Sequence, residues 1–140
     1  MQVTTSCPSV KLIVKAPRIV KATVLLVEDD GACRNALRRE LGRAGYDVCE
    51  AANGLEALFL VHHRHIDAIV TDIIMPSMGG LSLTSLVRKD APSMPIVAMT
   101  GVTSVGPAGA RLLEDSHVEL LNKPFQPDEL MAALLRAIAA

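Results

Sequence analysis

The sequence predicts an α/β fold in which five strands form a parallel sheet and five helices cover both of its faces. Short apolar runs alternate with longer stretches of helical periodicity from about residue 23 to the end of the chain. Several of these runs are apolar at every position, as in strands that are buried on both faces. Strands that alternate with helices along a chain join as parallel neighbours through right-handed crossovers.

Five segments have the composition of strands. The first, TVLLV at Thr23–Val27, is a continuous apolar run, whereas YDVCEA at Tyr46–Ala51 alternates between polar and apolar residues. Three later segments are IDAIVTD, PIVAMT and VELLN. The strands are therefore expected at residues 23–27, 46–51, 66–72, 95–100 and 118–122.

A helical pattern follows each of these strands. Gly42 and Gly45 are expected to end the first helix. Asn53 is expected to cap the second, with Glu56 completing a capping box, and Pro127 to begin the last. The fourth stretch is the poorest helix former because it contains two glycines and a proline. The helices are expected at residues 33–45, 53–65, 80–89, 102–115 and 127–140.

Composition narrows the class of protein. The 140 residues suit one domain, and half of them are hydrophobic. A formal net charge of -1 gives no electrostatic case for direct nucleic-acid binding. Three cysteines without metal-type spacing indicate reduced thiols in a cytoplasmic protein, and no apolar stretch is long enough for membrane insertion. Residues 1–21 contain four basic and no acidic residues, and we interpret them as a flexible arm or linker, with a functional tail as the alternative.

Polar residues follow four of the five expected strands. In an open parallel sheet these strand ends meet at one edge, where ligands bind. The residues at this edge are Glu28, Asp29 and Asp30 after the first strand, Asp72 after the third, Thr100 after the fourth, and Asn122 and Lys123 after the fifth. Each residue alone is explained as a turn or cap residue. Their occurrence together at four strand ends favours a binding site.

The types of residue at this edge indicate phosphoryl chemistry. Clustered carboxylates without His or Cys suit Mg²⁺, which takes hard oxygen ligands. A lysine and a hydroxyl beside the metal suit the oxygens of an incoming phosphoryl group. Asp72, at the end of the central strand, is then the expected nucleophile, because a carboxylate attacks a phosphoryl group to form an aspartyl phosphate.

The motifs VLLVEDD, IVTDIIMPSMGGLSL, PIVAMTG and LLNKPF resemble those of the receiver domains of two-component response regulators. The resemblance covers residues 22–140 and implies a flavodoxin-like, doubly wound five-stranded sheet with strand order 2-1-3-4-5. It implies that Asp72 is the phosphoacceptor. It further implies that Mg²⁺ is held by Asp29, by Glu28 and by the backbone carbonyl of Ile74, together with Asp72.

The resemblance also implies the parts of a switch. Thr100 matches the hydroxyl that moves to the phosphoryl group, and Lys123 matches the lysine that pairs with it. The Lys123–Pro124 bond is expected to be cis, and Gly101 matches a position kept small for access. The family has an aromatic residue three positions before the lysine, where this chain has Leu120, so the usual coupling between hydroxyl and aromatic is not expected.

The implied function is a signalling switch and not a turnover enzyme. A sensor histidine kinase or a phosphotransfer domain would donate the phosphoryl group, and phosphorylation would change the surface that binds an output partner. Arg34, Leu37 and Arg38 on the first helix are expected donor contacts. Two alternatives are an Asp-nucleophile phosphatase, which commonly has an acid where this chain has Ile74, and a binding module that is never phosphorylated, which Leu120 keeps open.

The apolar residues beside the site and a group of histidines lead to two further predictions. Ile74 and Val102 flank the site with apolar side chains, which cannot position a hydrolytic water, so the phosphoryl group is expected to be long-lived. The histidines at the end of the second helix are interpreted as a solvated helix end and not as a metal site. They are His62, His63 and His65.

Overall fold

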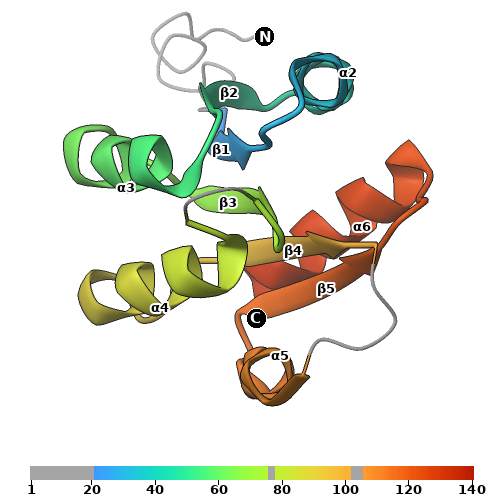
Figure 1. The fold of residues 1–140 in the computed structure, drawn as a ribbon. Helices are drawn as coiled ribbons and strands as arrows, with labels where there is room; N and C mark the ends of the chain where they lie inside the picture. Colours follow the sequence, from blue (N-terminus) through green and yellow to red (C-terminus); the bar gives the residue numbers. More distant parts are fainter. Residues whose placement is uncertain (1–20, 76–77, 102–105) are drawn as a thin grey trace, which may run out of the picture.

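The computed structural model describes residues 21–75, 78–101 and 106–140, and five strands alternate with five helices in this part of the chain (Figure 1). The elements are β1 (Thr23–Val27), α2 (Gly31–Arg43), β2 (Asp47–Ala51), α3 (Gly54–His63), β3 (Ala68–Asp72), α4 (Gly80–Asp90), β4 (Ile96–Thr100), α5 (Gly106–Glu114), β5 (Val118–Asn122) and α6 (Pro127–Ala139).

The strands form one parallel sheet in the order β2-β1-β3-β4-β5, which confirms the predicted topology. The register brings the last residues of the strands to one edge. Asp72 lies opposite Met99, and Thr100 lies opposite Asn122. The polar residues that follow the strands therefore share that edge, as the sequence predicts.

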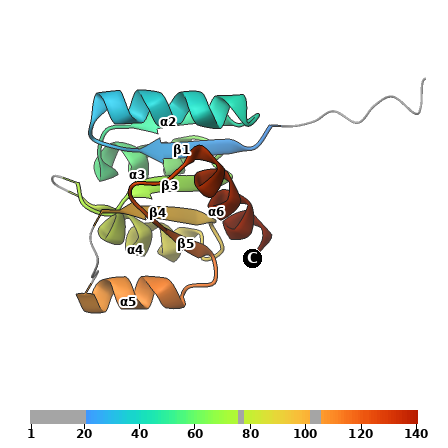
Figure 2. The same ribbon diagram turned by 90° about the vertical axis from the view of Figure 1, so that its right-hand side faces the viewer.

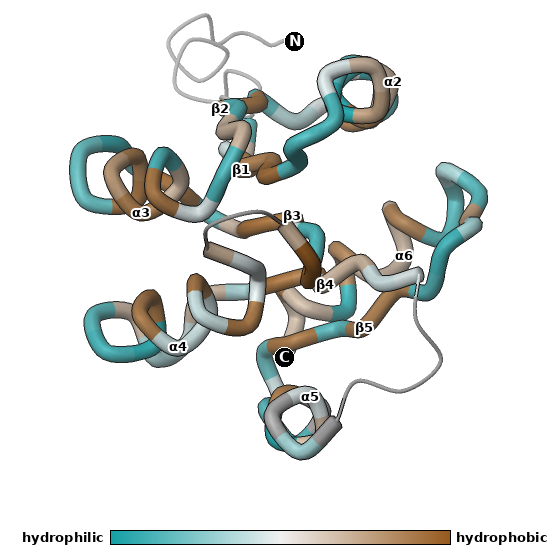
Figure 3. Tube along the Cα trace, viewed as in Figure 1, coloured by the Kyte–Doolittle hydropathy of each residue, from teal (hydrophilic) through white to brown (hydrophobic). Residues whose placement is uncertain are grey.

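The helices cover both faces of the sheet (Figure 2). Side chains of β1 alternate between two apolar clusters, because successive strand residues point to opposite faces. Leu25 packs with residues of α3, α4 and α5, whereas Leu26 packs with residues of α2 and α6. Figure 3 shows the resulting pattern, with the apolar strands at the centre and polar residues toward the outside of the helices. None of the helices described combines the length and apolar composition needed to cross a bilayer.

The ends of α2 explain part of the acidic sequence after β1. Asp30 is the N-cap, since its side chain accepts the backbone N–H of Ala32 at 3.2 Å. The helix ends at Arg43, and Gly45 follows with a φ of +97°, as expected for a helix-ending glycine. The prediction for Gly42 is wrong, because this residue lies inside the helix.

The predicted capping box of α3 forms only in part. Asn53 accepts the backbone N–H of Glu56 at 2.9 Å, as expected. The Glu56 side chain, however, accepts the N–H of Ala52 at 2.8 Å, one residue before the N-cap, so the bond is not reciprocal. Pro127 begins α6, as predicted.

The segment predicted as the poorest helix former contains α5. Its proline, Pro107, lies in the first turn, where its missing N–H removes no helical hydrogen bond. Leu112 anchors the helix in the core. Residues 102–105, which the prediction includes, lie outside the described residues, as do residues 1–20 of the predicted arm.

Candidate functional site

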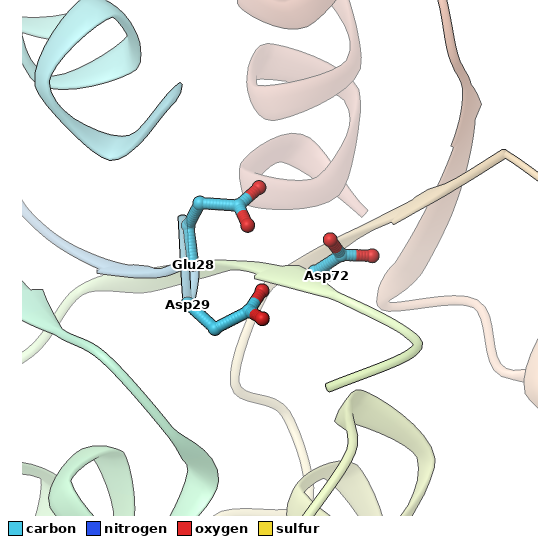
Figure 4. Close-up of side chains that lie close together, drawn as sticks. All are labelled: Glu28, Asp29 and Asp72. Atoms are coloured by element: carbon cyan, nitrogen blue, oxygen red, sulfur yellow. The ribbon is translucent and has the colours of Figure 1, made fainter. Parts of the chain in front are cut away.

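Three carboxylates meet at the carboxyl edge of the sheet. Glu28 and Asp29 directly follow β1, and Asp72 is the last residue of β3. One oxygen of each side chain lies within 4.8 Å of an oxygen of the other two (Figure 4). The structure therefore brings together the three acidic side chains that the sequence assigned to a metal site.

A lysine from the opposite side of the site contacts two of these acids. Lys123 Nζ lies 2.9 Å from Asp72 Oδ2 and 3.5 Å from Glu28 Oε1. The residue follows β5, and its backbone N–H donates to the carbonyl of Thr100 at 2.7 Å, which fixes the loop against β4. Its bond to Pro124 is cis, as expected.

Two of the three acids are largely shielded from solvent, whereas Asp29 is exposed. Glu28 is 2% exposed and Asp72 is 9% exposed. Burial raises the pKa of Glu28, and the nearby carboxylates of Asp29 and Asp72 add to that rise against the opposing effects of Lys123 and a backbone hydrogen bond. Burial works to lower the pKa of Lys123, but the hydrogen bond and charge of Asp72, with the charge of Glu28, outweigh it and raise the pKa.

The cluster has the donor set of a divalent-cation site. Glu28 Oε2 accepts the backbone N–H of Asp30 at 3.2 Å, but Oε1 is buried and accepts no hydrogen bond from the residues described. The ammonium of Lys123 lies 3.5 Å from this oxygen but also pairs with Asp72, so a further cation would lower the cost of burying it. Carboxylates alone, with no soft ligand in the group, fit a hard cation such as Mg²⁺.

The other predicted site residues lie at the same edge. Ile74 is two positions beyond Asp72, and its backbone N–H points to Asp72 Oδ1 at 3.4 Å. Its side chain is 63% exposed. Thr100 is buried at the end of β4, and Gly101 follows it with space around its Cα. Val102, the second apolar flank in the prediction, lies outside the described residues.

Two adjacent glycines, for which the sequence predicted no role, lie against the backbone of Asp72 and Ile73. A Cβ at Gly80 would lie 2.5 Å from the carbonyl oxygen of Asp72, and one at Gly79 would lie 2.6 Å from that of Ile73. The start of α4 can therefore lie directly on the backbone of the expected phosphoacceptor only because both residues lack a side chain. The adjacent glycines after MPSM are the sequence signal for this contact.

The first helix differs from its prediction. Leu37 is 9% exposed and packs in the core, which leaves little of its side chain for the predicted donor contact. Arg34 points back toward the site and donates through Nη1 to the carbonyl oxygen of Glu28 at 2.8 Å. Arg34 and Arg38 also pair with Glu50 of β2 at 3.4 and 3.5 Å.

The histidines predicted at the end of the second helix make separate contacts; His62 and His63 end α3, and His65 lies beyond it. His62 pairs with Asp90 at 3.0 Å, His63 stacks on Phe59, and His65 pairs with Asp67 at 2.7 Å. Among the described residues they form no metal-type group with one another.

Leu120 is half-buried in β5 and packs against the core, where the sequence analysis noted the absence of an aromatic side chain.

Comparisons with known proteins match most of the chain. Residues 24–135 match the family described as the response regulator receiver domain. The chain is 40% identical over 116 residues to the response regulator MprA of Mycobacterium sp. strain KMS, and 37% identical over 114 residues to the transcription factor SKN7 of Candida albicans. These alignments cover 81% of this chain but 50% and 20% of the two relatives, so the chain spans half of their length or less.

Solved structures of similar size have the same fold. The chemotaxis protein CheY4 of Vibrio cholerae is 32% identical, with a TM-score of 0.76 over 84% of this chain and 99% of that one. The receiver domain of the Francisella response regulator 1452 is 29% identical, with a TM-score of 0.75 over 85% of this chain and 98% of that one.

Proposed function

The chain belongs to the receiver domains of response regulators, a family of signalling switches, and on that basis we propose that it accepts a phosphoryl group on Asp72 in a Mg²⁺-dependent reaction. The proposed boundaries are residues 22–140 for the domain and 1–21 for an arm or linker. The proposed donor is the phosphohistidine of a sensor kinase or phosphotransfer domain. Phosphorylation then alters a surface that an output partner binds.

One observation carries this proposal most directly. Asp72 is nearly buried and hydrogen-bonded to Lys123, within a group of three carboxylates. A fold that only needed a charge pair at this edge would not place two further acids beside it, because like charges repel in a partly desolvated site. The surplus negative charge suits a site that binds a cation and then a phosphoryl group.

The residues of the site have distinct proposed roles. Glu28, Asp29, Asp72 and the carbonyl of Ile74 would hold Mg²⁺, which, when bound, offsets the negative charge of the phosphoryl oxygens. An oxygen of the Asp72 carboxylate attacks the phosphorus, and the bond between phosphorus and the donor nitrogen breaks, so the donor histidine leaves with the bonding electrons. Lys123 Nζ, released from the charge of Asp72, pairs with a phosphoryl oxygen.

Thr100 and the environment of the site would govern the later steps. Its hydroxyl, at the buried end of β4, donates a hydrogen bond to a phosphoryl oxygen and so links the modification to β4 and β5. The domain promotes its own phosphorylation and its slow hydrolysis, mainly by positioning the groups. A cytoplasmic location is part of the proposal and agrees with the free thiols of Cys33 and Cys49.

The proposal is tested by intact-mass measurement after incubation with acetyl phosphate and Mg²⁺. We expect a gain of one phosphoryl group in the wild type, and no gain with a chelator or in Asp72→Ala. Asp47→Ala is the matched control, because Asp47 is an exposed acid at the start of β2, at the opposite edge of the sheet. It should be phosphorylated like the wild type.

The same measurement separates the alternatives. If the wild type gains no mass, the chain is a binding module that is not phosphorylated, and the proposal is wrong. If Asp72→Ala still gains one phosphoryl group, another side chain is the acceptor.

A further inference from the structure

Glu28 and Asp29 pose a geometric question, because they are consecutive residues immediately after β1, and a continued strand would separate their side chains. Neighbouring side chains of a strand point to opposite faces of the sheet. Both carboxylates nevertheless reach the same group with Asp72, each with an oxygen within 4.8 Å of the others. The peptide unit between Glu28 and Asp29 must therefore be held in an orientation that turns both side chains into the site.

Pairing with β2 reaches only the preceding peptide unit, between Val27 and Glu28. The N–H of Glu28 donates to the carbonyl of Ala51 at 3.1 Å, the last residue of β2. The carbonyl of Glu28, which belongs to the peptide unit in question, has no further residue of β2 to accept from. Arg34 Nη1 fills this place from α2 and donates to that carbonyl oxygen at 2.8 Å.

The guanidinium is itself anchored from the neighbouring strand. Arg34 Nε lies 3.4 Å from Glu50 Oε1, and the other oxygen of Glu50 lies 3.5 Å from Arg38 Nε. The planar fork of Arg34 thus spans from the carboxylate on β2 to the carbonyl at the end of β1. The Arg34 side chain is only 24% exposed, so its guanidinium is largely packed against the protein and is not a freely solvated charge.

From these contacts we infer that Arg34 is a positioning residue for the cation site, which it orders by holding the peptide unit between Glu28 and Asp29. Glu50 acts through Arg34 by fixing its guanidinium. The inference rests on the proposed cation site and deepens it. It also gives Arg34 a role in the site itself, separate from the donor docking that the sequence predicted for this residue.

A positioning role and a simple charge effect predict changes of opposite sign in Mg²⁺ affinity when Arg34 is replaced. Arg34 carries a positive charge near the acidic cluster, so its removal should strengthen cation binding if only charge matters. Removal of a positioning contact should weaken binding, because the two carboxylates are then less well oriented. Residues that orient metal ligands typically contribute about tenfold or more to metal affinity.

The test is a Mg²⁺ titration of the full chain. Binding is monitored through amide NMR spectra, since the sequence has no tryptophan for a fluorescence readout. We expect the Kd for Mg²⁺ to rise about tenfold in Arg34→Gln. Arg34→Lys keeps the charge but loses the fork, and we expect it to be weakened in the same direction. Arg39→Gln, an exposed arginine on the same helix, is the matched control and should bind as the wild type does.

Phosphorylation by acetyl phosphate gives a second readout. At saturating Mg²⁺ the rate of the Arg34 variants should return close to that of the wild type, whereas the Mg²⁺ concentration for half-maximal rate should rise about tenfold. Unchanged or tighter Mg²⁺ binding in both variants would overturn the inference. If the wild type itself binds no Mg²⁺, the proposed cation site fails first. If Arg34→Gln does not fold, Arg34→Lys alone decides, because a pure charge role predicts no change there.

Discussion

Two sets of carboxylates in this molecule have opposite kinds of partner. Asp115, in the turn between α5 and β5, is bound by Arg88 Nε at 2.6 Å and by the backbone N–H of His117 at 2.8 Å. At the carboxyl edge, three carboxylates lie together, and one lysine pairs with two of them, Glu28 and Asp72. Asp115, Glu28 and Asp72 are all at least partly shielded from water, so the difference lies in the partners.

The pKa values follow the partners. Burial works to raise the pKa of Asp115, but Arg88 and the N–H of His117 outweigh it and lower the pKa. Burial and neighbouring carboxylates raise the pKa of Glu28. The protein itself supplies the hydrogen bonds that stabilise the Asp115 carboxylate. The acids at the carboxyl edge keep uncompensated negative charge, which a bound cation can neutralise.

The largest effect is expected from breaking the partnered group. Arg88→Met leaves Asp115 without its cation and removes the bond of Arg88 to the carbonyl of Ala91. Loss of one partner of a buried pair costs about 3–5 kcal/mol. Because the two side chains keep 17% and 24% of their exposure, we expect the free energy of unfolding to fall by about 2 kcal/mol.

Urea denaturation measures this change, and Lys89→Met, the exposed neighbour on α4, is the matched control. Because Arg88 lies outside the group of acids at the carboxyl edge, we also expect acetyl phosphate to phosphorylate folded Arg88→Met as it does the wild type. Equal stability of the two variants would show that the Asp115 pair contributes little to the fold.

The second-largest effect is expected when Mg²⁺ binds the acids at the carboxyl edge. Mg²⁺ that binds the folded chain alone stabilises it, by about 1.4 kcal/mol when its concentration is ten times its Kd. We expect the thermal midpoint of the wild type to rise with Mg²⁺ and to return with a chelator. Asp29→Asn should lose the shift, whereas Asp115→Asn should keep it. A shift that survives in Asp29→Asn would place the cation elsewhere.

A smaller effect, with opposite signs in the two groups, is expected from pH in metal-free buffer. The lowered pKa of Asp115 contributes stability that is present above its usual value of 3.8 and is lost as pH falls through the folded pKa. The raised pKa of Glu28 has the reverse effect, since stability declines as pH rises from the usual value of 4.5 through the folded pKa.

Denaturation curves of two variants separate these contributions. Asp115→Asn should flatten the pH dependence below 3.8, and Glu28→Gln should flatten the decline above 4.5. Identical pH profiles for the two variants would remove the distinction between the groups.

The sequence predicted the sheet and the gathering of the site well, because both depend on local patterns. The apolar run at Thr23–Val27 is a strand with the predicted bounds, and the acids after it meet Asp72 because parallel strands end at one edge. The strand order needed the resemblance to a known family, since periodicity does not specify which strands are neighbours.

The contacts that escaped prediction depend on the reach of side chains in the folded molecule. Leu37 and Arg34 lie three positions apart on α2, yet one is buried under α6 and the other turns back to the end of β1. Glu56 reaches one residue past the expected partner for the same reason. Periodicity shows which face of a helix is apolar, but it does not show where a long polar side chain finds its partner.

The smallest effect concerns the lifetime of the phosphoryl group. Ile74, beside Asp72, is 63% exposed and apolar, so it offers no hydrogen bond to an attacking water. We expect Ile74→Asn to shorten the half-life of the phosphorylated protein about threefold, which corresponds to about 0.6 kcal/mol in the activation free energy. Intact mass followed after removal of acetyl phosphate measures it, with Leu55→Asn, another exposed apolar residue, as the control. A wild-type half-life of seconds would contradict the prediction, because an apolar flank would then not limit hydrolysis. A longer half-life in Ile74→Asn would show that the added amide shields the phosphoryl group and does not orient water. The contrast between partnered and unpartnered acids would then also hold for the phosphorylated state of Asp72.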